Sequence, residues 1–451
     1  MKVYAFHIYH TAHFPQLALN IPQHATTTII SGAQGSGKTT ILKHLYHALT
    51  WFQGRYRDPK TAGVVMVAQD VQQQANASQL RVTVKLSKHL YTFVQELEHN
   101  SKLPKIYTWQ LRKTHTPTSN ISSVETTQLE NLVQIYQKAL QHDPDYGLPV
   151  IAYYPAERFI NEVNLLSKNN PQVTQALHAY DLATIPYTTF SRFFEWLREI
   201  HDIENAHSAA HAEYLSQTDL LDFQAQFQVQ ALRPHLTALK QSLNTVLPEV
   251  EDLILEYQPK LQLKVKVHGQ VLLYQQLSNS LKVWIALVGD IVRRLCLLNP
   301  KQLQPCLSGD GILMIDQIEQ QLDEQHSFEV IERLERAFPQ LQLIISTSQP
   351  ELLQQKSRYH CLHLENLTLT PLATQTQILD EHYSALYAEL IQAETTADTA
   401  LGLSDQQDHY LALLEKVQNE LDLQQQQQLL EELQKHIQQL ENPAHSNTPL
   451  K

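Results

Sequence analysis

Glycine is scarce in this chain, and its scarcity makes its placement informative. The 451 residues include only 11 glycines, and three of them fall in the short stretch from Gly32 to Thr39. Cysteine is scarcer still, because the chain has three cysteines and none of them forms a Cys-x-x-Cys pair. These counts argue against a disulfide framework and against a zinc site of the usual spacing. We therefore expect a reduced, cytoplasmic protein.

Long apolar runs and an excess of basic charge are also lacking. No run of about 18 apolar residues occurs, and the first residues carry no apolar leader with a cleavage site. We therefore expect neither a membrane span nor export. The formal net charge is −12, whereas a protein that coats nucleic acid carries a basic stripe or domain. A local basic groove stays open as an alternative.

The glycine-rich stretch fills the pattern G-x-x-x-x-G-K-[ST] between an apolar strand-like run and an amphipathic helix. This context predicts a phosphate-binding P-loop, because glycines let backbone N–H groups approach phosphate and the helix adds its positive end. Lys38 would contact the β- and γ-phosphates of ATP, and the Thr39 hydroxyl would bind Mg²⁺. The residues predicted to bind ATP here are Gly32, Gly35, Ser36, Gly37, Lys38, Thr39 and Thr40.

A second motif lies far along the chain. The apolar run from Gly311 to Ile315 ends in Asp316 and is followed by a helical segment and another buried strand, 341–347. This is the Walker B pattern. A parallel sheet delivers such an aspartate to the same edge as the P-loop, where it holds Mg²⁺ through water. Thr39 and Asp316 are therefore the predicted metal residues.

These motifs predict an α/β protein with four parts. They are an N-terminal ATPase lobe (1–118), a mainly helical insertion (119–260) whose core strand 149–154 belongs to the head, a C-terminal ATPase lobe (261–375), and a helical hairpin or coiled-coil tail (376–451). Strands are predicted at 3–8, 16–20, 25–31, 64–67, 80–86, 105–112, 261–267 and 271–274. Helix is predicted from about residue 119, and a helix buried on all sides at 281–298.

The ordered set of motifs resembles a bacterial family of ABC/SMC-type "predicted ATP-binding" proteins. That family includes the ATPase subunits of Septu-type and retron-associated anti-phage systems. Beside the two nucleotide motifs, the resemblance is carried by Tyr153-Tyr154-Pro155-x-x-Arg158, the aromatic segment 190–197, Leu277-Ser278, residues 286–295 and Thr347-Ser348-Gln349-Pro350. It spans about residues 1–375.

The resemblance implies a P-loop NTPase of the ABC/SMC-head type, in which two heads sandwich two ATP molecules. Each P-loop then faces the signature serine of the other protomer. Ser278 and Lys282 fall at the signature positions and are added to the predicted ATP-binding residues. Arg158 falls on the arginine that follows the family's tyrosine pair.

Several positions depart from the family's pattern. Gln317 stands where a glutamate polarises the attacking water, and an amide cannot accept its proton, which costs about 10²–10⁴ in rate. Ser348 replaces the switch histidine, and the signature has Ser280 for its glycine and Leu281 for its glutamate. The catalytic positions Gln317 and Ser348 are thus degenerate. For Glu319 we favour a dimer contact over a role as substitute base.

We weigh three alternative functions for this sequence. We favour a nucleotide-dependent dimeric switch or scaffold with weak or absent hydrolysis, a homodimer or higher oligomer, acting in anti-phage defence with an effector such as a nuclease. The alternative is an active ATPase that acts on DNA. A self-contained nuclease of the ATPase–TOPRIM type would need a downstream acidic cluster in a βαβ context, whereas the residues after 350 offer helices and glutamines.

Overall fold

The computed structural model describes residues 1–97, 103–116, 119–143, 146–158, 160, 176–180, 186–217, 233–349, 351–354 and 359–372. The chain divides into two compact units, Met1–Thr374 and Gln375–Lys451. All described residues belong to the first unit. The predicted helical tail, 376–451, lies outside the described residues, and so does Pro350.

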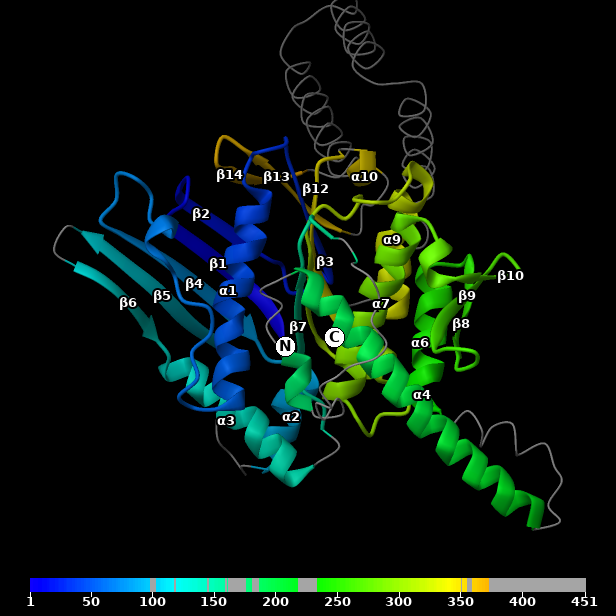
Figure 1. Cartoon of the computed structure of the whole chain (residues 1–451). Coiled ribbons are helices and arrows are strands. Elements are labelled where there is room, and N and C mark those ends of the chain that lie inside the picture. The colour runs from blue at the N-terminus through cyan, green and yellow to red at the C-terminus, as the bar shows by residue number, and fades with distance from the viewer. Residues whose placement is uncertain are drawn as a thin grey trace, which may run out of the picture. The chain divides into compact units, whose positions relative to one another are not determined.

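A six-stranded sheet forms the centre of the first unit (Figure 1). Its strands are β3 (Thr27–Ser31), β7 (Val150–Tyr154), β11 (Gly311–Ile315), β12 (Leu341–Thr347), β13 (His360–Glu365) and β14 (Thr368–Pro371). Their order is β14-β13-β3-β12-β11-β7, and all neighbours except β13 and β14 are parallel. Every residue of β3, β11 and β12 is buried. A parallel sheet covered on both faces buries its strands on both sides, which is why β11 is apolar throughout, while β3 and β12 also carry buried polar residues.

A five-stranded antiparallel sheet flanks the central sheet. It consists of β1 (Lys2–Thr11), β2 (Phe14–Asn20), β4 (Ala77–Lys85), β5 (Ile106–Thr116) and β6 (Ser119–Glu125), in the order β2-β1-β4-β5-β6. Buried and more exposed residues alternate along β4 and β5. One face of this sheet therefore packs on the core and the other faces solvent.

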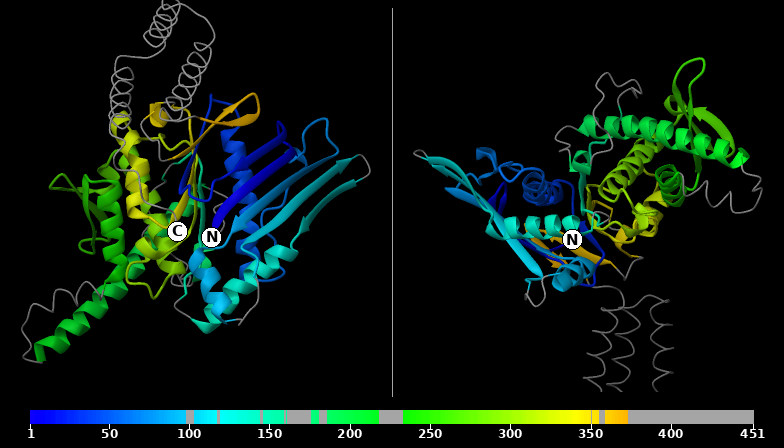
Figure 2. Two further views of the ribbon diagram at one scale, coloured as in Figure 1. Left: turned by 180° about the vertical axis from the view of Figure 1, so that it is seen from behind. Right: turned by 90° about the horizontal axis from the view of Figure 1, so that it is seen from below.

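Helix α1 (Lys38–Arg57) lies between these two sheets, as the views in Figures 1 and 2 show. The Trp109 indole N–H of β5 donates to the Ala48 carbonyl at 2.9 Å. On the other side, the Gln53 amide donates to the Ile151 carbonyl of β7 at 2.8 Å. The helix that begins at the P-loop is therefore held by both sheets. The same flanking lobe contains η1 (Ala68–Asp70), α2 (Lys88–Leu97) and α3 (Thr127–His142).

The remaining described elements cover the other side of the central sheet (Figure 1). The longest are α4 (Pro186–Gln217), α6 (Pro234–Val246), α7 (Asn279–Leu298) and α9 (Glu324–Ala337), with a three-stranded sheet of β8 (Val250–Glu256), β9 (Gln262–Val267) and β10 (Gln270–Leu273). Shorter ones are η2 (Ala176–Tyr180), η3 (Tyr274–Gln276), α8 (Pro305–Ser308) and α10 (Glu351–Gln354). Among the described helices, none has the length and apolar character that crossing a membrane requires.

Helix α7 is joined to the central sheet by a buried ionic cluster. The Asp290 carboxylate accepts hydrogen bonds from Arg293 at 2.9 Å, Arg294 at 2.8 Å and the Tyr154 hydroxyl at 2.8 Å. Burial raises the pKa of Asp290, but the two guanidinium groups outweigh this effect and hold the pKa below its usual value. The carboxylate is therefore charged, and it ties α7 to the last residue of β7.

The predicted α/β fold with a buried 281–298 helix is confirmed, but several elements differ from prediction. Residues 119–125 form strand β6 on a sheet edge, so helix begins only at Thr127. The run 64–67 is not a strand, because helix α1 satisfies the backbone of Val64 instead: its N–H donates to Thr50 Oγ1 at 2.8 Å and its carbonyl accepts from the Trp51 indole at 2.9 Å. Strands β8, β13 and β14 are additional to the prediction.

Candidate functional site

The P-loop connects β3 to α1 at the edge of the sheet where the parallel strands end. Gly35 and Gly37 have φ of 78° and 108°, which L side chains rarely adopt. A Cβ atom on Gly37 would lie 2.3 Å from the His13 ring, and one on Gly32 would lie 2.7 Å from the Leu364 carbonyl. The loop can therefore take this shape only with glycine at these positions.

Lys38 lies at the start of α1 and is almost fully buried. Its ammonium group donates to the carbonyls of Gly32 at 2.7 Å and Ala33 at 2.8 Å. Burial lowers the pKa of Lys38, while the carboxylates of Glu319 and Asp316 oppose this effect. The Lys38 side chain thus folds back onto the P-loop, and its charge interacts with Asp316 and Glu319 from the Walker B region.

Asp316 follows β11 and is fully buried. Strand β12 separates β11 from β3, and it supplies Ser346, whose hydroxyl donates to Asp316 Oδ1. The other carboxylate oxygen, Oδ2, has no hydrogen-bond partner among the described residues. The Ser36 hydroxyl of the P-loop is also buried without a partner there. An unpaired buried carboxylate oxygen is costly, so this edge of the sheet is suited to bind a cation.

The backbone of Gln317 is fixed from two sides. Its φ of 46° lies in the left-handed region, its N–H donates to Ser346 Oγ at 2.8 Å, and its carbonyl accepts from Arg158 at 2.9 Å. The residue after the Walker B aspartate is therefore held in place, and it presents an amide where the resembling family has a carboxylate.

Ser348 and Glu319 meet at the end of β12. The Ser348 N–H donates to Glu319 Oε1 at 2.8 Å, while the Ser348 residue is exposed. Thr347, which precedes it, pairs with Ser31, the residue before the P-loop. The two degenerate positions and Glu319 therefore lie on the same edge as the P-loop.

Ser278 and Lys282 lie elsewhere. Ser278 is exposed and caps α7 by accepting a hydrogen bond from the Leu281 N–H at 3.2 Å. Ser278 lines a cavity of about 820 Å³ together with Ser280, Trp284 and Gln321, and no P-loop residue lines it. In the described part of the chain, the hydrogen bonds of the Ser278 and Lys282 side chains go to Leu281 and Gln275 and do not reach the P-loop. The structure thus brings together the predicted P-loop and metal residues, and it leaves the predicted signature residues at a separate surface.

The residues at the P-loop edge fit ATP with Mg²⁺. Gly35 has free space where a Cβ would lie. Among the described residues, Lys38 Nζ binds the loop carbonyls of Gly32 and Ala33, which phosphate oxygens would replace, and Asp316 Oδ2 has no partner there. Thr39 is exposed in the first turn of α1, next to Lys38. Asp316 and Thr39 would hold Mg²⁺, whose charge would offset that of the phosphates.

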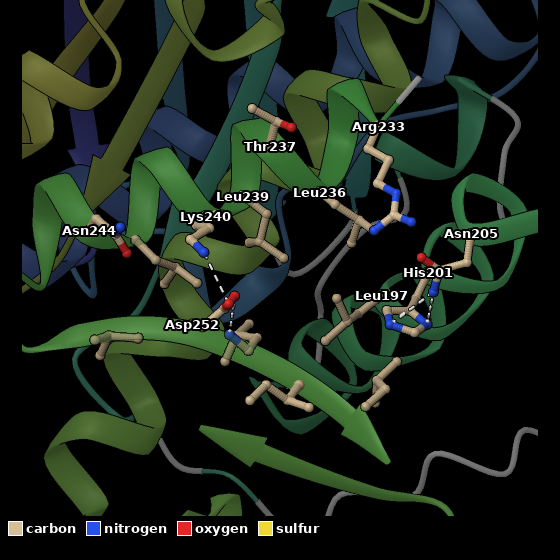
Figure 3. A pocket seen from close by; sticks show the side chains of 15 residues that line it. Leu197, His201, Asn205, Arg233, Leu236, Thr237, Leu239, Lys240, Asn244 and Asp252 are labelled. Atoms are coloured by element: carbon tan, nitrogen blue, oxygen red, sulfur yellow. Dashed lines mark hydrogen bonds and ion pairs between the residues drawn. The ribbon is translucent and has the colours of Figure 1, made fainter. Parts of the chain in front are cut away.

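A further cavity of about 340 Å³ lies between α4, α6 and β8 (Figure 3). Leu197, Leu236 and Leu239 line it beside His201, Asn205 and Arg233, and the Lys240 ammonium binds Asp252 at 3.0 Å. No residue of the P-loop or of the Walker B motif lines this cavity. It is therefore separate from the nucleotide site.

Comparison with known protein families decides the assignment. The model of a family described as "AAA domain" matches residues 11–251, more than half of the chain. The chain belongs to this AAA domain family. The matched residues include β3, the P-loop and α1. The family match therefore agrees with the strand, loop and helix that the structure has there.

Two relatives of this AAA protein are named as probable ATPases of retrons. The chain is 27% identical over 355 residues to the "Retron Vc95 probable ATPase" of Vibrio cholerae serotype O1 biovar El Tor, covering 72% of this chain and 66% of the relative. It is 26% identical over 398 residues to the "Retron Ec83 probable ATPase" of Escherichia coli, covering 78% and 69%. The chain thus matches about two thirds of each relative's length. The resemblance to retron-associated ATPases is confirmed.

Solved structures of SMC heads are also similar to this AAA protein. The SMC head domain from Thermotoga maritima is 11% identical, with a TM-score of 0.40, over 83% of this chain and 100% of that chain. A Pyrococcus furiosus Smc head domain with an extended coiled coil, bound to the C-terminal domain of ScpA, is 11% identical, with a TM-score of 0.43, over 86% and 99%.

Two residues of the site carry no signal in the sequence. Ser346 donates to Asp316 Oδ1 and accepts from the Gln317 N–H, but in the sequence it is one more residue of a buried strand. His13 lies against Gly37, yet strands β2 and β3 separate it from the P-loop along the chain. Tyr153 belongs to the tyrosine pair of the resemblance, but only the strand order places it near Asp316, since β7 pairs with β11. Burial and the Asp316 carboxylate raise the pKa of Tyr153.

We predict that Lys38→Ala lowers the affinity for ATP with Mg²⁺ by about 10- to 100-fold, because hydrogen bonds to a charged group contribute about 1.5–3 kcal/mol. Isothermal titration calorimetry measures this affinity. Lys43→Ala, on the exposed side of the same helix, is the matched control and should bind as the wild type does. Equal affinities for the wild type and Lys38→Ala would show that ATP binds elsewhere.

Proposed function

We propose that this chain is an ATP-binding switch whose heads pair around ATP and split it slowly. This proposal rests on one observation: the site has the residues that would bind ATP and Mg²⁺ but lacks a carboxylate at position 317. Lys38, Thr39 and Asp316 would supply the groups that bind ATP and Mg²⁺, whereas residue 317 has its backbone held in place and carries an amide side chain. Since Gln317 cannot take the proton of an attacking water, the bound ATP persists.

Pairing of heads is supported by the position of Ser278. This residue caps a 20-residue helix and is exposed beside a large cavity. The N-terminus of a helix offers N–H groups and positive charge to a phosphate. In a homodimer of the kind that the resemblance implies, a nucleotide held by one chain would meet Ser278 and Lys282 of the other chain.

The cellular context of the proposal rests on the relatives. Two of them are named as probable ATPases of retrons, and the family that the sequence resembles serves in anti-phage defence. We therefore propose that an effector protein in such a system recognises the ATP-bound state of this protein. A nuclease is the effector that the resemblance favours.

We expect the wild type to turn over ATP far more slowly than about one per second, the lower end of ordinary enzyme rates. Gln317→Glu should raise the rate by about 10²-fold or more, because it restores a proton acceptor at the position of the family's base. A radiolabelled-ATP assay measures both rates. Gln320→Glu, at an exposed position in the same loop, is the control.

A fast wild type would contradict this proposal. If it already turns over near one ATP per second, if Lys38→Ala abolishes that rate and if Gln317→Glu does not change it, then the amide at position 317 is no impediment to hydrolysis and the protein is an active ATPase.

One surface favours the second candidate function, an ATPase that acts on DNA. The solvent-facing side of the flanking sheet is basic. His7 pairs with Arg81, and Tyr9 and Arg112 both pair with Gln79, so these residues share one face. Lys85 lies on the same face, four residues after Arg81 along β4. Burial and the Arg81 charge lower the pKa of His7, so the positive charge of this face at neutral pH comes from Arg81, Arg112 and Lys85.

Acidic residues are nearly absent from this sheet. Its five strands contain one acidic residue, Glu125, whose carboxylate accepts a hydrogen bond from Gln110 at 2.6 Å. Such a face stands out in a chain with a net charge of −12. Arginines beside aromatic rings on an open sheet suit a nucleic-acid backbone and its bases.

We predict that the double change Arg81→Glu and Arg112→Glu weakens DNA binding and lowers the slope of log affinity against log salt concentration by about 2, one unit for each lost phosphate contact. Fluorescence anisotropy with a labelled oligonucleotide at several salt concentrations measures this. Lys138→Glu, an exposed residue of α3, is the control. An unchanged slope would remove this surface as a DNA-binding face.

A further inference from the structure

Glu319 occupies a fixed place in the loop after β11. Its carboxylate oxygen Oε1 accepts a hydrogen bond from the Ser348 N–H at 2.8 Å, and its own carbonyl accepts from the Leu322 N–H at 3.0 Å. Ser348 directly follows β12, the strand between the P-loop strand and the Walker B strand. The side chain is therefore anchored to the edge of the sheet at which phosphate would bind.

The second oxygen of this carboxylate is unused. Glu319 Oε2 is buried and has no hydrogen-bond partner in the part of the chain that the structure describes. The same holds for Asp316 Oδ2. A lone buried carboxylate oxygen costs several kilocalories per mole unless something pairs with it. The site therefore contains two unpaired acidic oxygens, and Mg²⁺ on Asp316 accounts for only one of them.

The strand order indicates which part of ATP Glu319 would face. Its partner Ser348 follows Thr347, and Thr347 pairs with Ser31, the residue before the P-loop. Burial lowers the pKa of Lys38, and the Glu319 carboxylate opposes this effect. Because a P-loop lysine contacts the β- and γ-phosphates, this carboxylate lies toward the end of the triphosphate that is cleaved.

We propose that Glu319, and not residue 317, is the catalytic carboxylate for the slow hydrolysis of ATP in this protein. This inference rests on the proposed function, since it requires ATP in the P-loop. In the reaction, a water oxygen bonds to the γ-phosphorus while the bond between that phosphorus and the bridging oxygen of ADP breaks. ADP leaves with the electron pair, and the proton of the water passes to Glu319 Oε2.

One contact and one free oxygen suit Glu319 to this role. Its anchoring oxygen accepts a hydrogen bond from the backbone N–H of Ser348, the residue at the position of the family's switch histidine. The other oxygen is buried without a partner among the described residues, so it can accept a proton. A dimer contact stays the prediction from the sequence for this residue, and the present proposal assigns its side chain a role inside the site.

The test is the substitution Glu319→Gln. A glutamine keeps an oxygen that accepts the Ser348 N–H, so the loop should keep its shape, but it cannot accept a proton. We expect the single-turnover rate, measured by rapid quench, to fall by about 10²-fold or more. After a fixed incubation, the nucleotide recovered from the purified protein should be mostly ATP, whereas the wild type under the same conditions should hold more ADP.

Two binding measurements separate a catalytic role from a structural one. The affinity for ATP and the affinity for Mn²⁺, the latter followed by electron paramagnetic resonance, should both stay within about twofold of the wild type. Glu329→Gln, an exposed glutamate of α9 that pairs with Arg333, is the control and should match the wild type in every assay.

Three outcomes would overturn the inference. The first is a Glu319→Gln variant that hydrolyses ATP at the wild-type rate. The second is a loss of Mn²⁺ affinity of tenfold or more, which would make Glu319 a metal ligand. The third is a wild type that binds ATP and never hydrolyses it. In each case the proposed ATP switch stands, because that proposal fails only if the wild type does not bind ATP, does not pair, or hydrolyses it rapidly.

Discussion

One buried arginine holds the candidate site together. The guanidinium of Arg158 is 1% exposed and donates to the carbonyls of Asp316 at 2.7 Å and Gln317 at 2.9 Å, and also to those of Gln320 and Pro155. Burial lowers its pKa to about 10 against the pull of Asp316 and Glu319, so it stays charged at neutral pH. The loop after β11 forms turns of its own and bonds to Ser346 and Ser348 as well. Arg158 adds bonds to three of its carbonyls, those of Asp316, Gln317 and Gln320, and so ties the start and the end of the loop together.

The same loop connects the nucleotide site to the signature surface. The Gln321 side-chain amide donates to the Arg158 carbonyl, and the Gln321 carbonyl accepts from Ser280 in the first turn of α7 and thus beside Ser278. The resembling family has glycine where this chain has Ser280, and glycine could not make this contact. If bound nucleotide shifts the loop near Asp316, the start of α7 would therefore shift too. A second head would dock at that end of α7. Such a route suits a switch that reports bound ATP more than an enzyme that consumes it.

The sequence predicted the parts of this site that local patterns encode. The P-loop pattern needs two glycines, a lysine and a hydroxyl within eight positions, and the strand ending in Asp316 follows from an apolar run before a carboxylate. Ser346 and the anchoring of Glu319 could not be predicted, because they depend on which strands are neighbours. The order β3-β12-β11 brings Ser346 to Asp316 and Ser348 to Glu319. Residues 119–125 form strand β6 where the sequence predicts helix. The sequence does not reveal this strand, because an edge strand can be polar and lack a clear alternating pattern.

We propose that two heads hold ATP between them and split it slowly. Native mass spectrometry of the purified chain with Mg²⁺ and ATP measures this, because it reports the number of chains and the chemical identity of each bound nucleotide together. We expect a species of two chains with two intact ATP molecules that persists for many minutes and that Lys38→Ala does not form. A single chain carrying ADP, or a dimer whose nucleotide is ADP at the first measurement, would show that the heads do not store ATP in this way.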